Sequence, residues 1–529
     1  MIGFSLRSLA TAVALVVALG GVLNAKPVHA QGTFIYGMPA DHSILDPHVT
    51  CGWMAKFVNY HIYEALVEID LQSADWPTKL KGQLAESWEI SDDGTEYVFH
   101  LRSGVKFHDG SPMNAAAVKY NFDRFLNPDA SHYNETANAY MGFIRFVADI
   151  KSVDVIDDLT IKITLTGPNY EFLRTGMEDC PQMYIISPTA LKKFGDEGIP
   201  LNPIGTGPFK FVERDPSVST TLERNDDYWG ENARLDKIIF RILEDPPTRV
   251  NALLAGEVHA IQDPPWDEIE GLEEEGFVIT KNDNAPTIWY LSFNLKNPVM
   301  KDVRVRQAIN YAINKEGITK RLLHGYGKPA HGMLNAGTYA YNPDFVSYPY
   351  DPDKARELLE EAGYADGLDL NFDVMIYGTG ELVEKWIQRD LKKVGVNVNL
   401  NKMEWLAYLD KWVAGMPEDV HMNEIIWGEQ VPRWTAFGYR CDRAPPNGNN
   451  IGWYCNAEMD KLFQQALTTA DEDERAALYQ KADEWIMMND PANAPIYHYF
   501  NPIALHPSVK GFVNAPSNWW DLSKVWIEK

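Results

Sequence analysis

The sequence predicts an α/β protein that is large enough to form more than one domain. The chain has 529 residues and 45% of them are hydrophobic, so it can bury extensive cores. Between residues 353 and 413, helix-like and strand-like apolar patterns alternate, which is typical of an α/β unit. A separate stretch, residues 84–124, has turn, strand and helix signals in the order of a compact supersecondary unit.

The stretch from 84 to 124 shows how these signals follow one another. Residues 93–94 (Asp-Gly) predict a turn, and residues 97–102 alternate apolar and polar side chains as a half-buried strand does. A second break follows at residues 109–110, and Asn114 can cap a helix. The apolar face of that helix is formed by Val118, Phe122 and Phe125.

Strands and helices are predicted along the rest of the chain by the same criteria. The helix from residue 302 has an Asp302 cap, and the helix from residue 248 stops at Gly256. The expected strands are 34–36, 158–165, 235–242, 288–294, 370–376, 396–400 and 493–500, and the expected helices are 248–257, 302–323, 353–363, 382–394, 405–413, 457–469 and 472–488.

The first 30 residues have the pattern of a cleavable signal peptide. Arg7 supplies a positive charge, residues 9–23 are apolar, and residues 28–30 (Val-His-Ala) form a small-x-Ala cleavage site before Gln31. The apolar run is short for a membrane span, although an uncleaved anchor is the alternative. No Cys follows it, so a lipid anchor is not indicated. We therefore expect a soluble periplasmic protein of a Gram-negative bacterium.

The chain is strongly acidic. Its formal net charge is −26, and loss of residues 1–30, which hold two basic and no acidic side chains, takes this to about −28. Such a charge argues against nucleic acid as a partner. A solvated acidic surface explains it, and a cationic ligand is the alternative.

The four cysteines suit an oxidising compartment. Cys441 and Cys455 flank a Pro/Gly/Asn-rich loop and are expected to close it as a disulfide, which leaves Cys51 and Cys180 to pair by elimination. Free buried thiols are the alternative. The spacing of cysteines and histidines gives no zinc pattern, so no metal site is expected.

Several ordered motifs resemble the family 5 (peptide, opine and nickel type) extracellular solute-binding proteins of ABC importers. The signature positions in the first stretch are Trp88, Gly94, Phe99, Leu101, Arg102, Gly104, Phe107, His108, Asp109, Gly110 and Pro112. Further matches are LDPH at 45–48, NPIGTGPF at 202–209, NDDYWG at 225–230, DVRVRQAINYAIN at 302–314 and NAPIYHYF at 493–500. The glycines at 205–207 are not a phosphate loop, because no Lys-Ser/Thr follows them.

This resemblance implies a two-lobe periplasmic binding protein of the α/β class, class II-like and of the large peptide-binder type. Lobe one is expected at residues 31–286 plus 493–529, with an inserted subdomain at about 70–200, and lobe two at 287–492. The implied function is to capture a small solute by hinge closure and deliver it to an inner-membrane ABC permease. A monomer without cofactor is expected.

The sequence contains no familiar catalytic motif. G-x-S-x-G, H-E-x-x-H and the P-loop are all absent, and the 13 histidines are scattered. His498, between two tyrosines, is expected in a cleft or core rather than on a metal. No catalytic residue is therefore expected, and a secreted hydrolase with an unfamiliar site remains the alternative.

The segment 425–437 is the most informative about the ligand. In the family's peptide binders the matching run is W-x-x-D with a later Phe, and its Asp pairs with the peptide's α-ammonium. Trp427 and Phe437 keep that spacing, but the Asp position is Gln430, an amide that makes weaker bonds to a cation. Glu429 can substitute. A register slip is the alternative, because the positions that follow are Arg433 and Trp434.

The second charged anchor of dipeptide binders is also missing. Their carboxylate-binding Arg follows the strand that corresponds to 370–376, where this chain has Tyr377 and no Arg. Aromatic residues at Trp53, Trp427, Trp434, Tyr497 and Tyr499 can line a cleft or pack the core. Such a cleft suits peptides, opines, oligosaccharides, aromatic compounds or metal chelates, so the ligand stays open.

Overall fold

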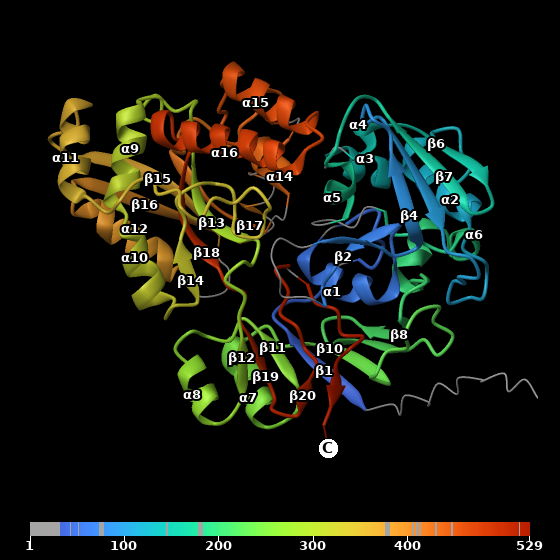
Figure 1. Cartoon of the computed structure of the whole chain (residues 1–529). Helices are drawn as coiled ribbons and strands as arrows, with labels where there is room; N and C mark the ends of the chain where they lie inside the picture. The colour runs from blue at the N-terminus through green and yellow to red at the C-terminus, as the bar shows by residue number, and fades with distance from the viewer. Residues whose placement is uncertain are drawn as a thin grey trace, which may run out of the picture.

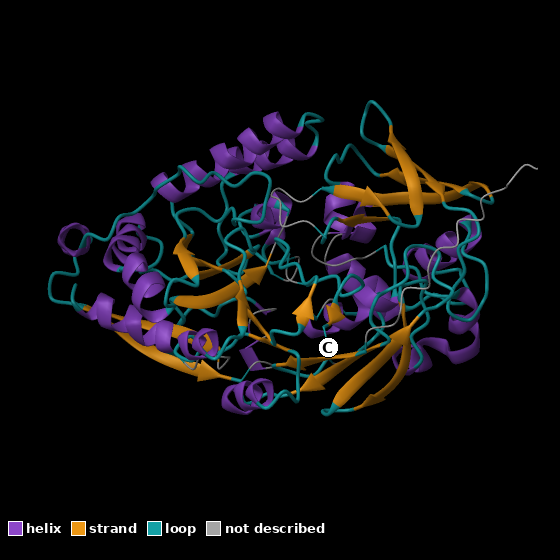
Figure 2. Cartoon of the chain, turned by 60° about the horizontal axis from the view of Figure 1, so that its bottom comes forward, coloured by secondary structure: helices purple, strands orange, loops and turns teal. Residues whose placement is uncertain are grey.

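The computed structural model describes residues 32–528, apart from residues 43, 51, 73–78, 144–145, 178–182, 376–380, 405–406, 409–410, 412–413, 429–430, 446–447 and 518. The described strands form a seven-stranded, a six-stranded and a four-stranded sheet together with two strand pairs. Figure 1 shows the six-stranded sheet above the seven-stranded one and the four-stranded sheet at the side, and Figure 2 shows the strands gathered into separate groups with helices around them.

The seven-stranded sheet is built around the first described strand, β1 (Thr33–Met38). This strand pairs in parallel with β10 (Lys237–Ile242) and β11 (Ala260–Gln262). Its side chains Phe34, Tyr36 and Met38 are buried against α1 (Trp53–Ile62) and neighbouring elements. The remaining elements are β8 (Phe209–Asp215), β9 (Ser219–Arg224), β12 (Val278–Thr280), β19 (Ile503–Leu505), α7 (Pro246–Leu254) and α8 (Ile269–Glu274).

The four-stranded sheet contains the stretch whose motifs were the most regular. The strands run in the order β4 (Ala85–Ile90), β5 (Glu96–Leu101), β7 (Thr160–Leu165) and β6 (Ile150–Asp157), all antiparallel. The alternation on β5 is confirmed, because Tyr97, Phe99 and Leu101 are buried and the residues between them are partly exposed. The Asn114 cap is also confirmed: its Oδ1 accepts the Ala117 amide of α2 (Ala115–Leu126) at 3.0 Å.

Further short elements surround this sheet. Glu64, two residues after the end of α1, accepts hydrogen bonds from Tyr228 Oη at 2.6 Å and Trp229 Nε1 at 2.7 Å, which joins the NDDYWG motif to the same core. The elements are β2 (Val67–Ile69), β3 (Leu80–Gly82), α3 (Glu135–Phe143), α4 (Phe146–Asp149), α5 (Phe172–Met177), α6 (Pro188–Gly198) and the 3₁₀ turn Ile199–Leu201.

The six-stranded sheet has a layer of helices on each face. Its order is β14 (Gly327–Pro329), β18 (Asn493–Tyr499), β13 (Thr287–Phe293), β17 (Met422–Gly428), β15 (Leu368–Met375) and β16 (Val396–Met403). One face packs on α9 (Val303–Ala312), α11 (Pro352–Glu361) and α12 (Leu382–Lys392). The other packs on α14 (Pro432–Phe437), α15 (Ala457–Leu467) and α16 (Glu472–Asn489).

Two expectations about this unit are wrong. The helix expected over 302–323 begins after the Asp302 cap but ends at Ala312, because Ile313 is extended and Asn314 caps a new short helix, α10 (Lys315–Gly317), which runs into a π turn, Ile318–Leu322. Placing residues 493–499 in the first lobe is also wrong. This strand pairs with β13 on one side and β14 on the other, so it is an inner strand of the six-stranded sheet.

The chain therefore passes between the two large sheets at residues 281–286 and again at residues 500–502. The two crossovers touch, since the Asn282 amide donates to the Phe500 carbonyl at 3.1 Å. Close to them, Tyr499 Oη donates to Asp263 Oδ1 at 3.0 Å, a bond from the six-stranded sheet to the end of β11. Two adjacent short connections are the geometry that permits hinge motion.

The ends of the chain complete the description. Residues 503–528 return to the seven-stranded sheet through β19 and end in the strand pair β20 (Val509–Lys510) and β21 (Trp526–Ile527). The expected signal peptide lies outside the described residues, as does most of the helix expected at 405–413. Within the described residues no helix has both the length and the apolar character needed to cross a membrane.

Candidate functional site

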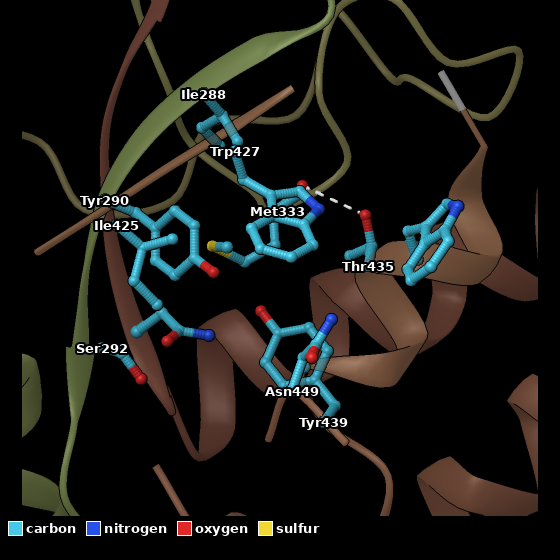
Figure 3. A pocket seen from close by; sticks show the side chains of 12 residues that line it. Ile288, Tyr290, Ser292, Met333, Ile425, Trp427, Thr435, Tyr439 and Asn449 are labelled. Atoms are coloured by element: carbon cyan, nitrogen blue, oxygen red, sulfur yellow. Dashed lines mark hydrogen bonds between the residues drawn. The ribbon is translucent and has the colours of Figure 1, made fainter. Parts of the chain in front are cut away.

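A pocket lies on the face of the six-stranded sheet that α14 covers (Figure 3). The space inside it that can hold the centre of a water molecule is about 30 Å³, which is room for one or two waters in this conformation. Its walls come from strands β13 and β17, the first residue of β18, the loop after β14, helix α14 and the loop that follows it. The lining residues are Ile288, Tyr290, Ser292, Met333, Ile425, Trp427, Trp434, Thr435, Gly438, Tyr439, Asn449 and Asn493.

The sheet side of the pocket follows from strand alternation. Ile288, Tyr290 and Ser292 occupy alternate positions of β13, so their side chains point to one face. The antiparallel register places Trp427 opposite Ile288 and Ile425 opposite Tyr290, which adds two β17 side chains to that face. The intervening residues, such as Trp289 and Leu291, pack in the core on the other face of the sheet.

The polar groups of the pocket are few and uncharged. Thr435 Oγ1 donates to the Met333 carbonyl at 3.4 Å, and burial raises the pKa of Tyr439 well above its usual value, which keeps its phenol neutral. Among the described residues, no hydrogen-bond partner exists for the buried atoms Trp434 Nε1 and Asn449 Oδ1. A pocket with aromatic walls and unsatisfied polar atoms is typical of a small-molecule site.

Two of the expected site residues come together here. The rings of Trp427 and Trp434 lie 6.5 Å apart, and Phe437 packs edge-on against Trp434 at 5.2 Å. Arg433 instead points out of the pocket and forms a buried ion pair with Asp149 of the four-stranded unit at 2.5 Å. Arg433 is only 5% exposed, and its partner is already a carboxylate of this chain.

Tyr497 and Tyr499 lie on the opposite face of the sheet. Tyr497 stacks on Trp289 at 5.9 Å between ring centres, inside the core that α9, α11 and α12 cover. Tyr499 lies at the crossovers, where its hydroxyl binds Asp263. The structure therefore does not bring these two tyrosines together with Trp427.

The side chains of the remaining expected site residues lie outside the described part of the structure. Gln430, Glu429 and Tyr377 lie outside the described residues, as do Cys51 and Cys180. Trp53 begins α1, but its side chain is likewise not described.

The expected disulfide between Cys441 and Cys455 is present. It closes a loop that contributes Asn449 to the pocket wall. Within the same loop Asn450 Nδ2 donates to the carbonyls of Arg440 at 2.9 Å and Tyr454 at 2.5 Å. The disulfide therefore fixes one side of the pocket.

Several lining residues escaped the sequence analysis. Tyr290 and Ile288 were inside an expected strand, and pairing that strand with the Trp427 strand would have found them. Met333, Tyr439 and Asn449 come from irregular segments whose positions no local pattern indicates. No group of three or more His, Cys, Asp or Glu side chains in the described part of the chain is arranged to hold a metal ion.

A polar cluster joins the four-stranded unit to the helices above the pocket. Glu171, which is fully buried, accepts hydrogen bonds from Tyr339 Oη and, at 2.7 Å, from Tyr479 Oη. Arg475 Nε donates to Tyr339 Oη at 2.8 Å and lies 4.0 Å from Glu171. With the Arg433 to Asp149 pair, these bonds hold the two units together on the side of the molecule away from the crossovers, where α14 and α5 face each other in Figure 1.

Two α/β units joined by adjacent crossovers, with an aromatic pocket in one unit, are the features of a solute receptor. The family model of the bacterial extracellular solute-binding proteins, family 5, matches residues 79–432. The chain belongs to this family. Its fold is accordingly that of a two-lobe periplasmic binding protein, and the family and its structural neighbours are binding proteins rather than enzymes.

Individual relatives agree with this assignment. Heme-binding protein A of Haemophilus influenzae is 32% identical over 483 residues, with 86% of this chain and 85% of that protein covered. The dipeptide-binding protein of Escherichia coli is 30% identical over 488 residues, covering 88% and 89%. The solved structure of the periplasmic binding protein DppA from Helicobacter pylori with the peptide STSA has a TM-score of 0.81 and 29% identity, covering 94% of this chain and 99% of that one.

Proposed function

We propose that this protein captures a small solute in the Trp427 pocket and presents it to an inner-membrane ABC permease. The observation that carries this proposal is the uncharged aromatic pocket with two buried polar atoms that have no partner among the described residues. Side chains in that position are satisfied when a ligand supplies the missing donor and acceptor. The names of the relatives, which mention dipeptides, heme and a tetrapeptide, support a solute of that size range.

The pocket lining favours a ligand with an apolar or aromatic group. None of the twelve lining side chains carries a charge at neutral pH, and Arg433 is committed to Asp149. A charged ligand group buried against such walls would lose its hydration without gaining an ionic partner. A peptide that places an aromatic side chain here is one candidate. Aromatic or other non-peptide solutes are the second, because Gln430 replaces the acidic anchor of peptide binders.

Closure of the lobes is the proposed mechanism. Ligand that contacts both lobes favours the closed state by its differential affinity. Arg433 and Trp434 are consecutive on α14, so one helix carries both a pocket wall and an ion pair to the other unit. Occupation of the pocket therefore acts on the helix that joins the lobes.

The division of the chain and its location belong to the same proposal. We place lobe one at residues 31–286 and 500–529, with the inserted subdomain at about 70–200, and lobe two at 287–499. Residues 1–30 are proposed to be a cleaved signal peptide that delivers the protein to the periplasm, where it acts as a monomer without nucleic acid or cofactor. The family's description as extracellular supports this location.

A thermal-shift panel on the mature protein, stripped of carried-over ligand by unfolding and refolding, tests the proposal. The panel contains di- to pentapeptides, opines, oligosaccharides, aromatic acids and metal chelates. A solute that binds only the folded state raises Tm. At a concentration of a hundred times its Kd, it increases the free energy of unfolding by about 2.7 kcal/mol. A shift with free-amine peptides that N-acetylation abolishes indicates that Glu429 or another acid takes the place of the missing Asp. A shift from another class alone removes peptides as candidates, and no shift from any class contradicts the proposed function.

A further inference from the structure

A single row of side chains crosses the six-stranded sheet from one wall of the pocket. The antiparallel registers place Trp427 opposite Ile288, Ile288 opposite His498 and His498 opposite Lys328. Directly opposed residues on neighbouring strands point to the same face. With strands about 4.8 Å apart, Lys328 lies roughly 10 Å from Ile288. The row begins at the aromatic pocket and ends at an ammonium group.

The far end of this row is a cluster of basic side chains, defined here as the basic cluster: Lys315, Lys328, His331 and His498. Lys315 is 4% exposed, and its Nζ donates to the Ala330 carbonyl at 3.0 Å. Lys328 Nζ lies over the Tyr341 ring at 4.8 Å, and the same ring packs edge-on against His498 at 5.3 Å. Tyr341 therefore holds the cluster together from the side opposite the sheet.

Three ring nitrogens of the basic cluster have no hydrogen-bond partner among the described residues. His498 is 1% exposed, and neither of its ring nitrogens has a hydrogen-bond partner among the described residues. The buried Nδ1 of His331 also has no hydrogen-bond partner in that part of the chain. Among the described residues, neither Lys315 nor Lys328 forms an ion pair. Burial lowers the pKa of Lys315 to about 7, which is the response of an ammonium group without a nearby carboxylate.

Two acids that line a small cavity together with His331, Asp483 and Glu484, are occupied elsewhere. Asp483 accepts the amides of Met333 at 3.0 Å and Leu334 at 3.3 Å. Glu484 accepts from Asn342 Nδ2 at 2.7 Å. Burial lowers the pKa of Lys328 and that of His331. The charges of Asp283 and Glu316, respectively, raise these two pKa values, but their effects are smaller than that of burial. Buried basic groups normally have a polar partner, and among the described residues no carboxylate forms an ion pair with Lys315 or Lys328.

We propose that the basic cluster binds a carboxylate or similar anionic group of the same solute whose apolar part occupies the Trp427 pocket. The inference rests on the proposed function and narrows it to amphiphilic anions whose charged group lies roughly 10 Å from an aromatic or apolar group. The anion supplies acceptors to Lys328 and to a ring N–H of His498. The two ends of the row thereby select opposite ends of one ligand.

Two matched pairs of probes distinguish a peptide carboxylate from a non-peptide acid. The first pair is N-acetyl-Phe-Ala and its C-terminal amide, and the second is 6-phenylhexanoate and its amide. Each pair differs in one charge at nearly constant shape. Calorimetric titration of the stripped protein is expected to show at least tenfold tighter binding of an acid than of its amide, because a charge-assisted bond is stronger than a neutral one. The pair that shows this preference identifies the source of the anion.

Variants assign that preference to the cluster. In Lys328→Gln the acid and amide are expected to bind within about twofold of each other, and His498→Phe is expected to reduce the preference. Lys461→Gln, which changes an exposed lysine on α15, serves as the control and is expected to keep it. Equal binding of acid and amide to the wild type, or a preference that survives Lys328→Gln, overturns the inference. If other solutes of the panel bind while neither pair does, the basic cluster is not a ligand site and the proposed function stands.

Discussion

Replacing Glu171 by Gln tests whether the polar cluster between the units holds the closed state. The carboxylate accepts hydrogen bonds from Tyr339 and Tyr479, both from the other lobe. A hydrogen bond to a charged group contributes about 1.5–3 kcal/mol and a neutral one about 0.5–1.5 kcal/mol, so Glu171→Gln loses roughly 1 kcal/mol for each bond. The closed state is then destabilised by about 2 kcal/mol, and solute affinity falls by about thirtyfold.

Two measurements on this variant separate closure from general stability. Calorimetric titration with the best solute of the thermal-shift panel gives the change in Kd. Urea unfolding of each variant gives the change in folding free energy. Glu458→Gln is the control, because Glu458 forms an exposed ion pair within α15 and is expected to change neither quantity by much. An unchanged Kd together with reduced stability would show that these bonds support the fold rather than lobe closure.

Three further predictions concern the pocket, its loop and a buried acid. Trp427→Ala removes a pocket wall and is expected to weaken solute binding by about 2 kcal/mol, or thirtyfold, while the circular dichroism spectrum stays native; unchanged affinity would exclude this pocket. Replacing Cys441 and Cys455 together by Ser opens a loop of about 15 residues and is expected to lower the free energy of unfolding, measured by thermal unfolding, by about 3 kcal/mol. An unchanged free energy of unfolding would show that the loop is ordered without the disulfide. Burial raises the pKa of Glu64 to about 7, so the native state keeps a proton that the unfolded chain has lost, and stability falls as pH rises from about 5 to 8, by up to about 3 kcal/mol. Glu64→Gln is expected to flatten this profile, although Glu68, whose pKa is also about 7, retains part of it; exposed Glu86→Gln is the control, and identical profiles for all three proteins would contradict the assignment.

Much of the fold was predictable because strand alternation and helix capping depend only on residues that are close together in the sequence. The alternation on β5, the Asn114 cap and the Asp302 cap each depend on a few neighbouring residues, and each is present. The helix expected over 302–323 failed because its apolar spacing continues past residue 313 while Asn314 offers the backbone a competing cap. The position of residues 493–499 failed for a different reason, since a strand's partners are decided by distant segments.

The candidate site was predictable only where it lies on regular strands and next to a motif. Trp427 and Trp434 were expected from their segment and do line the pocket. Tyr497 and Tyr499 were expected on composition alone, and the pleat of β18 turns them to the other face, while His498 between them faces the Trp427 side. Arg433 belongs to the same informative segment, but its partner is Asp149, which is distant in the sequence. Side-chain direction on a strand depends on register, and register is not a local property.

Small-angle X-ray scattering of the stripped mature protein, with and without a saturating solute from the panel, tests the central claim most directly. Capture by closure predicts that the solute reduces the radius of gyration in a one-to-one titration, because the ligand favours the state in which the lobes meet. A solute that binds one-to-one and leaves the radius of gyration unchanged in both the wild type and Glu171→Gln would contradict capture by closure.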